Sequence, residues 1–90
     1  MFTVYILYSI AYNKTYVGQT KDLDNRLLEH NVTAIKGFTV SYRPWVLIHQ
    51  EDYATRTEAM KREKYLKSGM GREFVKTIVL TFIKNQGAME

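Results

Sequence analysis

The strongest constraint on the fold is a tight turn between two strand-like segments at the start of the chain. Residues Thr3–Tyr8 are dense in β-branched and aromatic side chains, and Thr15–Val17 have the composition of a returning strand. The Asn13–Lys14 dipeptide between them supplies turn chemistry. The pattern therefore predicts a β-hairpin. If paired residue numbers sum to about 21, Tyr5 and Tyr16 face each other across it.

The rest of the chain alternates between helical and extended patterns. A helix is predicted from near Thr20 to His30, followed by an aperiodic loop over Asn31–Arg43. Trp45–Glu51 is apolar on both faces, as in a central strand covered on both sides. A second helix is predicted over Thr55–Lys67, and a third over the stretch containing Phe74–Phe82, where β-branched residues leave a strand as an alternative. The expected fold is α/β (α+β), a three-stranded antiparallel sheet flanked by about three helices in the order β-β-α-β-α-α.

Size and composition favour a small folded domain. Ninety residues, 46% of them hydrophobic, suit a single domain over residues 1–90. The chain has no cysteine, which excludes disulfides and thiolate metal sites and suits a reducing compartment, so we expect a cytoplasmic location. The N-terminus lacks a secretory signal pattern, and the most apolar run, Thr77–Ile83, is too short to cross a bilayer. We therefore expect no membrane partner.

The second helix carries a carboxylate where its apolar face is expected. Steps of 100° per residue put Glu63 between Ala59 and Leu66. A carboxylate directed inward is costly unless it is paired, hydrogen-bonded or bound to a metal. Both an ion pair with a nearby arginine and a metal ligand remain open. Glu58, by contrast, is explained by the capping-box pattern that begins at Thr55.

The first helix and the hairpin carry further polar candidates. Arg26 and His30 are four residues apart and so lie one above the other on the helix. They could meet a phosphate and handle a proton, or Arg26 could pair with a glutamate while His30 caps the helix. Tyr5 and Tyr16 could join them in a polar cluster, although paired strand aromatics usually serve packing.

Taken together, these residues resemble the GIY-YIG nuclease superfamily. The first motif would be Val4-Tyr5-Ile6 and the second Tyr16-Val17-Gly18, followed by Arg26, by His30 and by a helix whose functional glutamate matches Glu63. The resemblance runs from about Phe2 through Arg72. The chain looks most similar to small stand-alone bacterial members and to the N-terminal nuclease module of the excinuclease that acts in DNA repair.

The sequence departs from the family pattern at two points. Val4 replaces the glycine that gives the first motif its name, while the tyrosine after it is retained. Many members also place an asparagine near the end of the module. Asn85 lies beyond the third helical stretch and is a poor match for it. The lack of a matching asparagine argues against full catalytic activity.

The resemblance implies a divalent-metal-dependent endonuclease that hydrolyses phosphodiester bonds, with DNA the expected nucleic acid. Glu63 would hold one Mg²⁺ or Mn²⁺ ion. Arg26 would grip the scissile phosphate, and Tyr16 would act as the base while Tyr5 orients it or the water. His30 would relay a proton or hold a tyrosine. The alternative is a binding or adaptor module of the same fold that cleaves weakly or not at all.

The basic residues of the chain are a further set of candidates, which are expected to contact phosphates. Thirteen lysines and arginines against nine acidic residues give a net charge of +4, which favours polyanionic partners. The side chains expected to contact nucleic acid are Lys21, Lys36, Arg43, Arg62 and Lys67, with Lys64 and Arg72 as further candidates. Each of them could equally be a solvated surface charge. So few contacts predict weak, salt-sensitive binding, to which an additional protein partner could add affinity.

Overall fold

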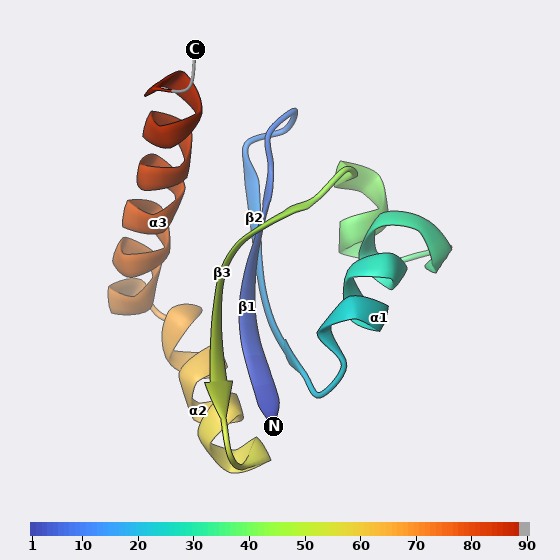
Figure 1. The fold of residues 1–90 in the computed structure, drawn as a ribbon, viewed down its shortest axis with the longest axis vertical. Helices are drawn as coiled ribbons and strands as arrows, with labels where there is room; N and C mark the ends of the chain where they lie inside the picture. The colour runs from blue at the N-terminus through green and yellow to red at the C-terminus, as the bar shows by residue number, and fades with distance from the viewer. Residues whose placement is uncertain (89–90) are drawn as a thin grey trace.

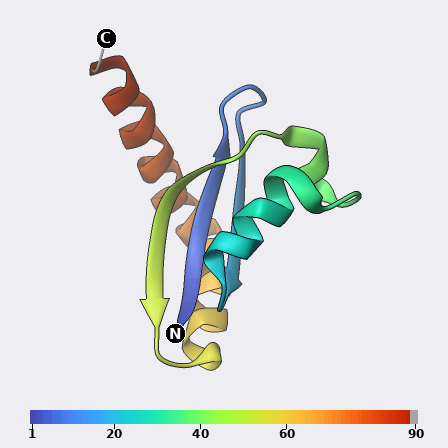
Figure 2. The ribbon, with the colours of Figure 1, turned by 45° about the vertical axis from the view of Figure 1, so that its right-hand side comes forward.

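The computed structural model describes residues 1–88 and places helices on both faces of a three-stranded sheet (Figures 1 and 2). The strands are β1 (Phe2–Ser9), β2 (Lys14–Thr20) and β3 (Val46–Tyr53), and the helices are α1 (Leu23–Leu28), α2 (Arg56–Leu66) and α3 (Gly69–Ala88). All strand pairs are antiparallel, in the order β2-β1-β3. The predicted fold class and element order are confirmed.

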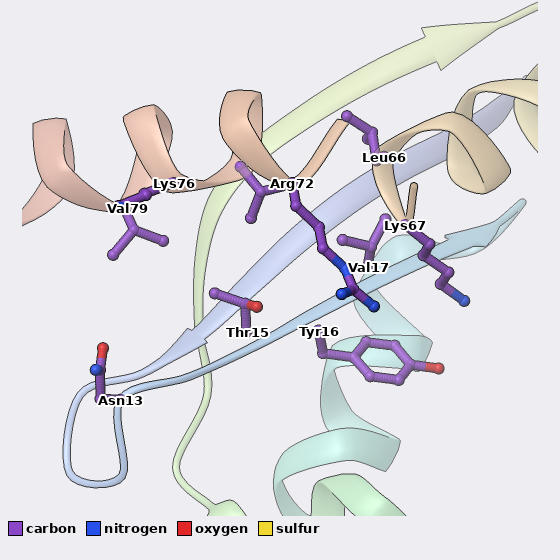
Figure 3. A pocket seen from close by; sticks show the side chains of 10 residues that line it. Asn13, Thr15, Tyr16, Val17, Leu66, Lys67, Arg72, Lys76 and Val79 are labelled. Carbon is purple, nitrogen blue, oxygen red and sulfur yellow. The ribbon is translucent and has the colours of Figure 1, made fainter. Parts of the chain in front are cut away.

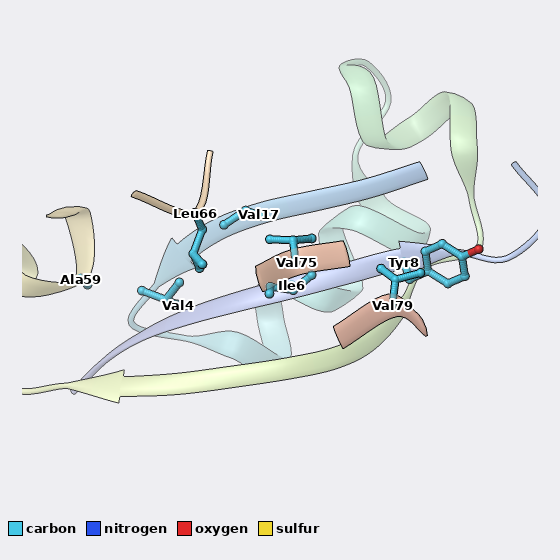
Figure 4. Close-up of a cluster of buried hydrophobic side chains, with 8 residues drawn as sticks. All are labelled: Val4, Ile6, Tyr8, Val17, Ala59, Leu66, Val75 and Val79. Atoms are coloured by element: carbon cyan, nitrogen blue, oxygen red, sulfur yellow. The ribbon is translucent and has the colours of Figure 1, made fainter. Parts of the chain in front are cut away.

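One layer of the core lies between the sheet and the last two helices. Figure 4 shows Val4 and Ile6 of β1 directed toward side chains of α2 and α3, among them Leu66 and Val75. A second, smaller cluster lies on the opposite face, where Tyr5 and Leu7 of β1 meet α1 and the segment that follows it. Because β1 alternates between the two layers, it is buried from Val4 through Ser9.

The hairpin register differs from the prediction by two residues. Tyr5 pairs with Gly18, and Tyr16 pairs with Leu7. The turn between the strands is longer than a two-residue loop because Asn13, at a φ of 51°, adopts the left-handed conformation that asparagine tolerates. A shift of two residues keeps every side chain on its face, so both tyrosines still point to the same side of the sheet.

The prediction that Trp45–Glu51 forms the central strand is wrong. β1 is central and β3 is an edge strand. β3 is apolar on both faces because helical layers cover both sides of the sheet: Ile48 packs into the α2–α3 cluster and Leu47 into the cluster on the α1 face. A strand can therefore be covered on both faces and still lie at the edge of the sheet.

The first helix is shorter than the predicted span from Thr20 to His30, and the loop after it is more structured than predicted. α1 begins at Leu23, where the Asp22 side chain accepts a hydrogen bond from the Asn25 amide, 3.1 Å. A π-helical turn over Glu29–Thr33 follows, and a 3-10 helix forms over Phe38–Tyr42. The predicted aperiodic loop thus contains two short helical turns, and π-helical turns are frequent at functional sites.

The last two helices agree with the sequence pattern. Thr55 caps α2, its hydroxyl oxygen accepting from the Glu58 amide at 3.2 Å. The Glu58 carboxylate accepts from the Thr55 hydroxyl, 2.9 Å, instead of reaching back to the Thr55 amide. α3 is helical throughout its length, which excludes the strand alternative. Within residues 1–88, no helix is both long enough and apolar enough to cross a membrane.

Candidate active site

A cluster of three aromatic side chains lies on the α1 face of the sheet. Tyr5 of β1 is fully buried, and His30, in the π-helical turn, is 6% exposed. The Tyr5 hydroxyl lies 2.8 Å from His30 Nε2. The Tyr16 ring of β2 is centred 4.8 Å from the His30 ring and 6.2 Å from the Tyr5 ring. The sequence candidates Tyr5, Tyr16 and His30 therefore meet, and His30 contacts Tyr5 instead of capping a helix.

The hydrogen bonds of this cluster run in one direction. The Arg26 guanidinium lies close enough to the Tyr5 hydroxyl to lower the pKa of the phenol, and because a guanidinium can only donate, it faces the lone pairs of the Tyr5 oxygen. This charge favours the orientation in which the Tyr5 O–H points to His30 Nε2. In that orientation His30 Nδ1 carries the ring proton and donates to Thr39 Oγ1, 3.0 Å away. This assignment makes His30 a neutral imidazole protonated on Nδ1.

The pKa shifts of Tyr5 and His30 are consistent with these hydrogen-bond directions. Burial raises the pKa of Tyr5 to about 12, outweighing the hydrogen bond from Arg26 that lowers it. Burial also lowers the pKa of His30, and the positive charge of Arg26 lowers it further. At neutral pH, Tyr5 is a phenol and His30 is uncharged. Tyr5 is thus suited to positioning other groups and unsuited to taking a proton.

Gly18 makes room for the Tyr5 side chain. It pairs with Tyr5 across the hairpin, and a Cβ atom added there would lie 2.5 Å from the Tyr5 hydroxyl oxygen. Any larger residue would push the phenol away from His30. This contact gives a physical reason for the glycine that ends the second motif. Gly18 lies inside β2, which continues to Thr20.

Thr39 supports the site from the 3-10 helix, and sequence reasoning missed it. It is 7% exposed, and its carbonyl oxygen accepts from Trp45 Nε1 at 2.7 Å. The Trp45 amide donates to Asn31 Oδ1 at 2.6 Å, which ties this segment to the π-helical turn. Nothing in the aperiodic segment around Thr39 distinguishes it from a surface threonine in the sequence.

Arg26 has an unused donor. Its Nη1 lies 3.5 Å from Glu29 Oε1, so the ion pair left open by the sequence forms with Glu29. Its Nε is buried and has no hydrogen-bond partner among the described residues. A buried N–H without a partner costs about 1–3 kcal/mol, which an oxygen of a bound ligand would recover.

Glu63 extends from α2 toward the edge of the sheet. Its side chain is 23% exposed, and Oε2 accepts from Lys67 Nζ at 2.7 Å, so its partner is a lysine rather than an arginine. Its negative charge adds to the effect of burial in raising the pKa of Tyr5, which links it electrostatically to the aromatic cluster. Gln19 of β2 lines the same groove as Glu63, and Gln19 Oε1 is buried without a partner within residues 1–88.

The donor set at Glu63 suits a hard divalent ion held mainly by water. Among residues 1–88, no three His, Cys, Asp or Glu side chains are grouped closely enough to hold a metal ion. Mg²⁺ is usually bound through one or two carboxylates, with waters and phosphate oxygens completing its shell. One carboxylate beside an unpartnered amide oxygen fits that mode of binding, once Lys67 releases Glu63.

The basic candidates fall into two groups. Arg43 and Arg62 are engaged within the protein. Arg43 donates to three backbone carbonyls, those of His30 (2.6 Å), Ala34 (2.7 Å) and Glu29 (3.0 Å), and Arg62 holds both carboxylate oxygens of Glu51, at 2.8 and 3.0 Å. Lys21 and Lys36 are exposed, and Lys67 is exposed apart from its bond to Glu63. Lys64 and Arg72 line surface grooves beside β2.

Comparisons with known proteins identify the family of the chain. The profile of the family described as "GIY-YIG catalytic domain" matches residues 1–86. A UPF0213 protein of Staphylococcus epidermidis is 36% identical over 63 residues, covering 70% of this chain and 77% of the relative. A UPF0213 protein of Staphylococcus haemolyticus is 33% identical over 66 residues, covering 73% and 80%.

A solved structure has a similar fold. It is the solution NMR structure of a UPF0213 protein from Bacillus halodurans, which is 27% identical, covers 87% of this chain and 85% of its own, and superposes with a TM-score of 0.51. The fold, the spacing of the motifs and the family match agree with one another. The chain belongs to the GIY-YIG catalytic domain family.

Proposed function

We propose that this protein is a divalent-metal-dependent endonuclease that hydrolyses phosphodiester bonds in nucleic acid, with DNA the expected substrate. The GIY-YIG domain is a nuclease fold, and its nucleases generally use divalent metal ions. The observation that carries the proposal is the unpartnered, buried Nε of Arg26, whose positive charge acts on both Tyr5 and His30. A phosphate oxygen is the natural acceptor for such a group.

Arg26 would bind the scissile phosphate. Its ion pair with Glu29 spans 3.5 Å and its Nε is free within residues 1–88, so the side chain can accept a second anion without a large rearrangement. The guanidinium lies beside the Tyr5 hydroxyl, whose pKa it lowers. A fixed fork of donors stabilises the charge that develops on the phosphate in the transition state.

Tyr16 would act as the general base. In its phenolate form, Tyr16 would take a proton from water as the water oxygen bonds to phosphorus and the P–O ester bond breaks, and it would become a neutral phenol. Tyr5 is a poor candidate for this step because its pKa is about 12.

Glu63 would hold the Mg²⁺ or Mn²⁺ ion, which supplies neutralising charge to the phosphate and the leaving oxygen. Its carboxylate must first exchange Lys67 Nζ, 2.7 Å away, for the ion. The exchange releases Lys67 as a free cation next to the substrate.

The Glu63–Lys67 ion pair also favours a second candidate function, a nucleic-acid-binding module of the same fold that does not cleave. In that case Lys67 would keep the carboxylate occupied and the Arg26 cluster would only bind phosphate. The lack of a good counterpart for the family's asparagine points in the same direction.

Cleavage of a panel of labelled nucleic acids distinguishes the two functions. Branched, nicked, single-stranded and double-stranded DNAs and RNAs would be incubated with Mg²⁺, Mn²⁺ or EDTA. Wild type would be compared with Glu63→Gln and with Glu73→Gln, a matched change at an exposed glutamate of α3. The nuclease proposal expects metal-dependent products from wild type and Glu73→Gln but not from Glu63→Gln. Binding without products from any variant would support the binding module.

A further inference from the structure

Two grooves lie one after the other along the free edge of the sheet. β2 is an edge strand, so its outer side is not paired with another strand within residues 1–88. One groove, of about 520 Å³, is lined by Thr15, Tyr16 and Val17 of β2 and by residues of α3. The other, of about 580 Å³, is lined by Gln19 of β2 and by residues of α2. Together the grooves follow β2 along its length.

Lys67 connects the two grooves because it lines both of them. In Figure 3, Lys67 and Arg72 extend from the helical side toward β2, and Tyr16 projects from β2 toward the opposite layer. The α2 groove contains Glu63 and the α3 groove contains Tyr16. The proposed metal ligand therefore stands in these grooves, and β2, which borders both of them, carries the proposed base with its ring on the opposite face of the sheet.

The basic side chains of these grooves differ from the other basic candidates. Lys61 and Lys64 line the α2 groove, and Arg72 and Lys76 line the α3 groove. Each of the four is exposed, and none has a side-chain hydrogen bond or ion pair to another residue within 1–88. Glu63 is the single acidic residue among the lining residues of the two grooves. The surface is complementary to a polyanion and has free donors to offer it.

The floor of the α3 groove adds an apolar strip. Val17, Leu66, Val75 and Val79 lie beneath the basic rim. A phosphodiester strand has the same two-sided character, since its phosphates are charged while its sugars offer apolar faces. The stretch from Thr15 to Gln19 spans about 13 Å, which corresponds to the rise of about four nucleotides along one strand.

We propose that the two grooves bind the nucleic-acid strand that is cut, with its backbone running along the outer edge of β2. Lys61 and Lys64 contact phosphates on one side of the scissile bond, and Arg72 and Lys76 contact those on the other. The strand then passes Glu63 at the position of Lys67, along the edge of the strand that carries Tyr16. This inference rests on the proposed function, because it assigns the path of that function's substrate.

The test measures binding without cleavage. Fluorescence anisotropy in EDTA follows a fluorescein-labelled DNA duplex with a single-stranded overhang, titrated with protein at several salt concentrations. The groove variants are Lys61→Gln/Lys64→Gln and Arg72→Gln/Lys76→Gln. The control, Arg56→Gln/Lys84→Gln, removes the same charge from two exposed residues that line neither groove. Circular dichroism verifies that each variant is folded.

We expect each groove variant to raise Kd about tenfold and to reduce the slope of log K against log salt by about 1.5, as two lost phosphate contacts require. The control should change Kd less than about threefold. Equal weakening by the control variant would overturn the proposal and indicate a diffuse charge effect. Wild-type affinity in the groove variants, or no binding by wild type, would also overturn it.

The binding experiment and the cleavage experiment can fail independently of each other. Lost binding in the groove variants together with no cleavage by wild type would support the path and reject the nuclease. Cleavage that depends on Glu63 together with unchanged binding in the groove variants would reject the path and support the nuclease.

Discussion

The Tyr5 hydroxyl is hydrogen-bonded to His30 Nε2 at 2.8 Å, and both side chains are buried on the α1 face of the sheet. This bond connects the central strand to the π-helical turn. The Arg26 guanidinium lies close to the same hydroxyl and lowers the pKa of Tyr5, against the larger effect of burial. The two tyrosines of the family motifs have different surroundings: Tyr5 is a fully buried link, while Tyr16 is partly exposed.

This difference predicts unequal effects of removing the two hydroxyls. Tyr16→Phe should reduce the rate of cleavage by about 100-fold or more, since it removes the general base. It should leave the free energy of unfolding nearly unchanged. Tyr5→Phe should reduce the rate less but destabilise the fold by about 1–3 kcal/mol, because His30 Nε2 loses its partner in a buried site.

Single-turnover rates and urea unfolding of both variants check this prediction. The opposite order, with Tyr5→Phe the slower and more stable variant, would assign the base to Tyr5 and contradict the proposed roles.

Thr39 should determine the tautomer of His30. Thr39→Val keeps the shape of the side chain but removes the acceptor for Nδ1–H, so the Nδ1-protonated form should lose its preference. Thr39→Ser retains the hydroxyl and should behave as wild type. Two-dimensional ¹H–¹⁵N spectra of the histidine ring nitrogens report the tautomer directly. An unchanged His30 spectrum in Thr39→Val would contradict the positioning role of Thr39.

Gly18→Ala should displace the Tyr5 side chain. The new Cβ would lie 2.5 Å from the Tyr5 hydroxyl oxygen, and the resulting overpacking should cost about 1–3 kcal/mol. Gly69→Ala is a suitable control because a Cβ at Gly69 would meet no atom within 4 Å. Thermal unfolding compares the two variants. Equal Tm values would show that Tyr5 can move without cost.

Glu51 should make the fold sensitive to acid. Burial alone would raise its pKa, but hydrogen bonds from Arg62, Tyr53 and His49 hold the pKa at about 2, below the ordinary value of 4.5. A lowered folded-state pKa contributes stability that is present above pH 4.5 and is lost as pH falls toward 2. Glu51→Gln should therefore destabilise the protein by about 1–3 kcal/mol at pH 7.

Thermal unfolding of wild type and Glu51→Gln between pH 7 and pH 2 tests this linkage, with Glu73→Gln as the control. The difference in Tm between wild type and Glu51→Gln should shrink as the pH falls. A difference that stays constant down to pH 2 would show that the Glu51 charge does not contribute.

The overall fold could be predicted because the sequence changes its hydrophobic period at each element. The register of the hairpin could not, since it depends on Asn13 entering the left-handed region and lengthening the turn. The position of β3 was missed for a related reason. Apolar residues on both faces show that two layers cover the strand, but they do not show which strand lies at the edge.

Part of the candidate site could be predicted, because the spacing of residues along a helical segment determines which way their side chains point. Arg26 in α1 and His30 in the π-helical turn, four residues apart, both lie near Tyr5 on the α1 face of the sheet. Thr39 was not predictable because its position depends on how the 3-10 helix packs against Trp45. The engagement of Arg43 by backbone carbonyls is likewise a tertiary property, since an engaged and a free arginine look the same in a sequence.

The most direct test of the central claim is single-turnover cleavage by Arg26→Lys next to wild type, in the presence of Mn²⁺. Lysine keeps the positive charge but lacks the Nε donor and the planar fork of the guanidinium. If Arg26 grips the scissile phosphate, wild type cleaves and Arg26→Lys loses about 100-fold or more in rate while binding nucleic acid as before. Cleavage at the wild-type rate by Arg26→Lys, or none by wild type, would contradict the account.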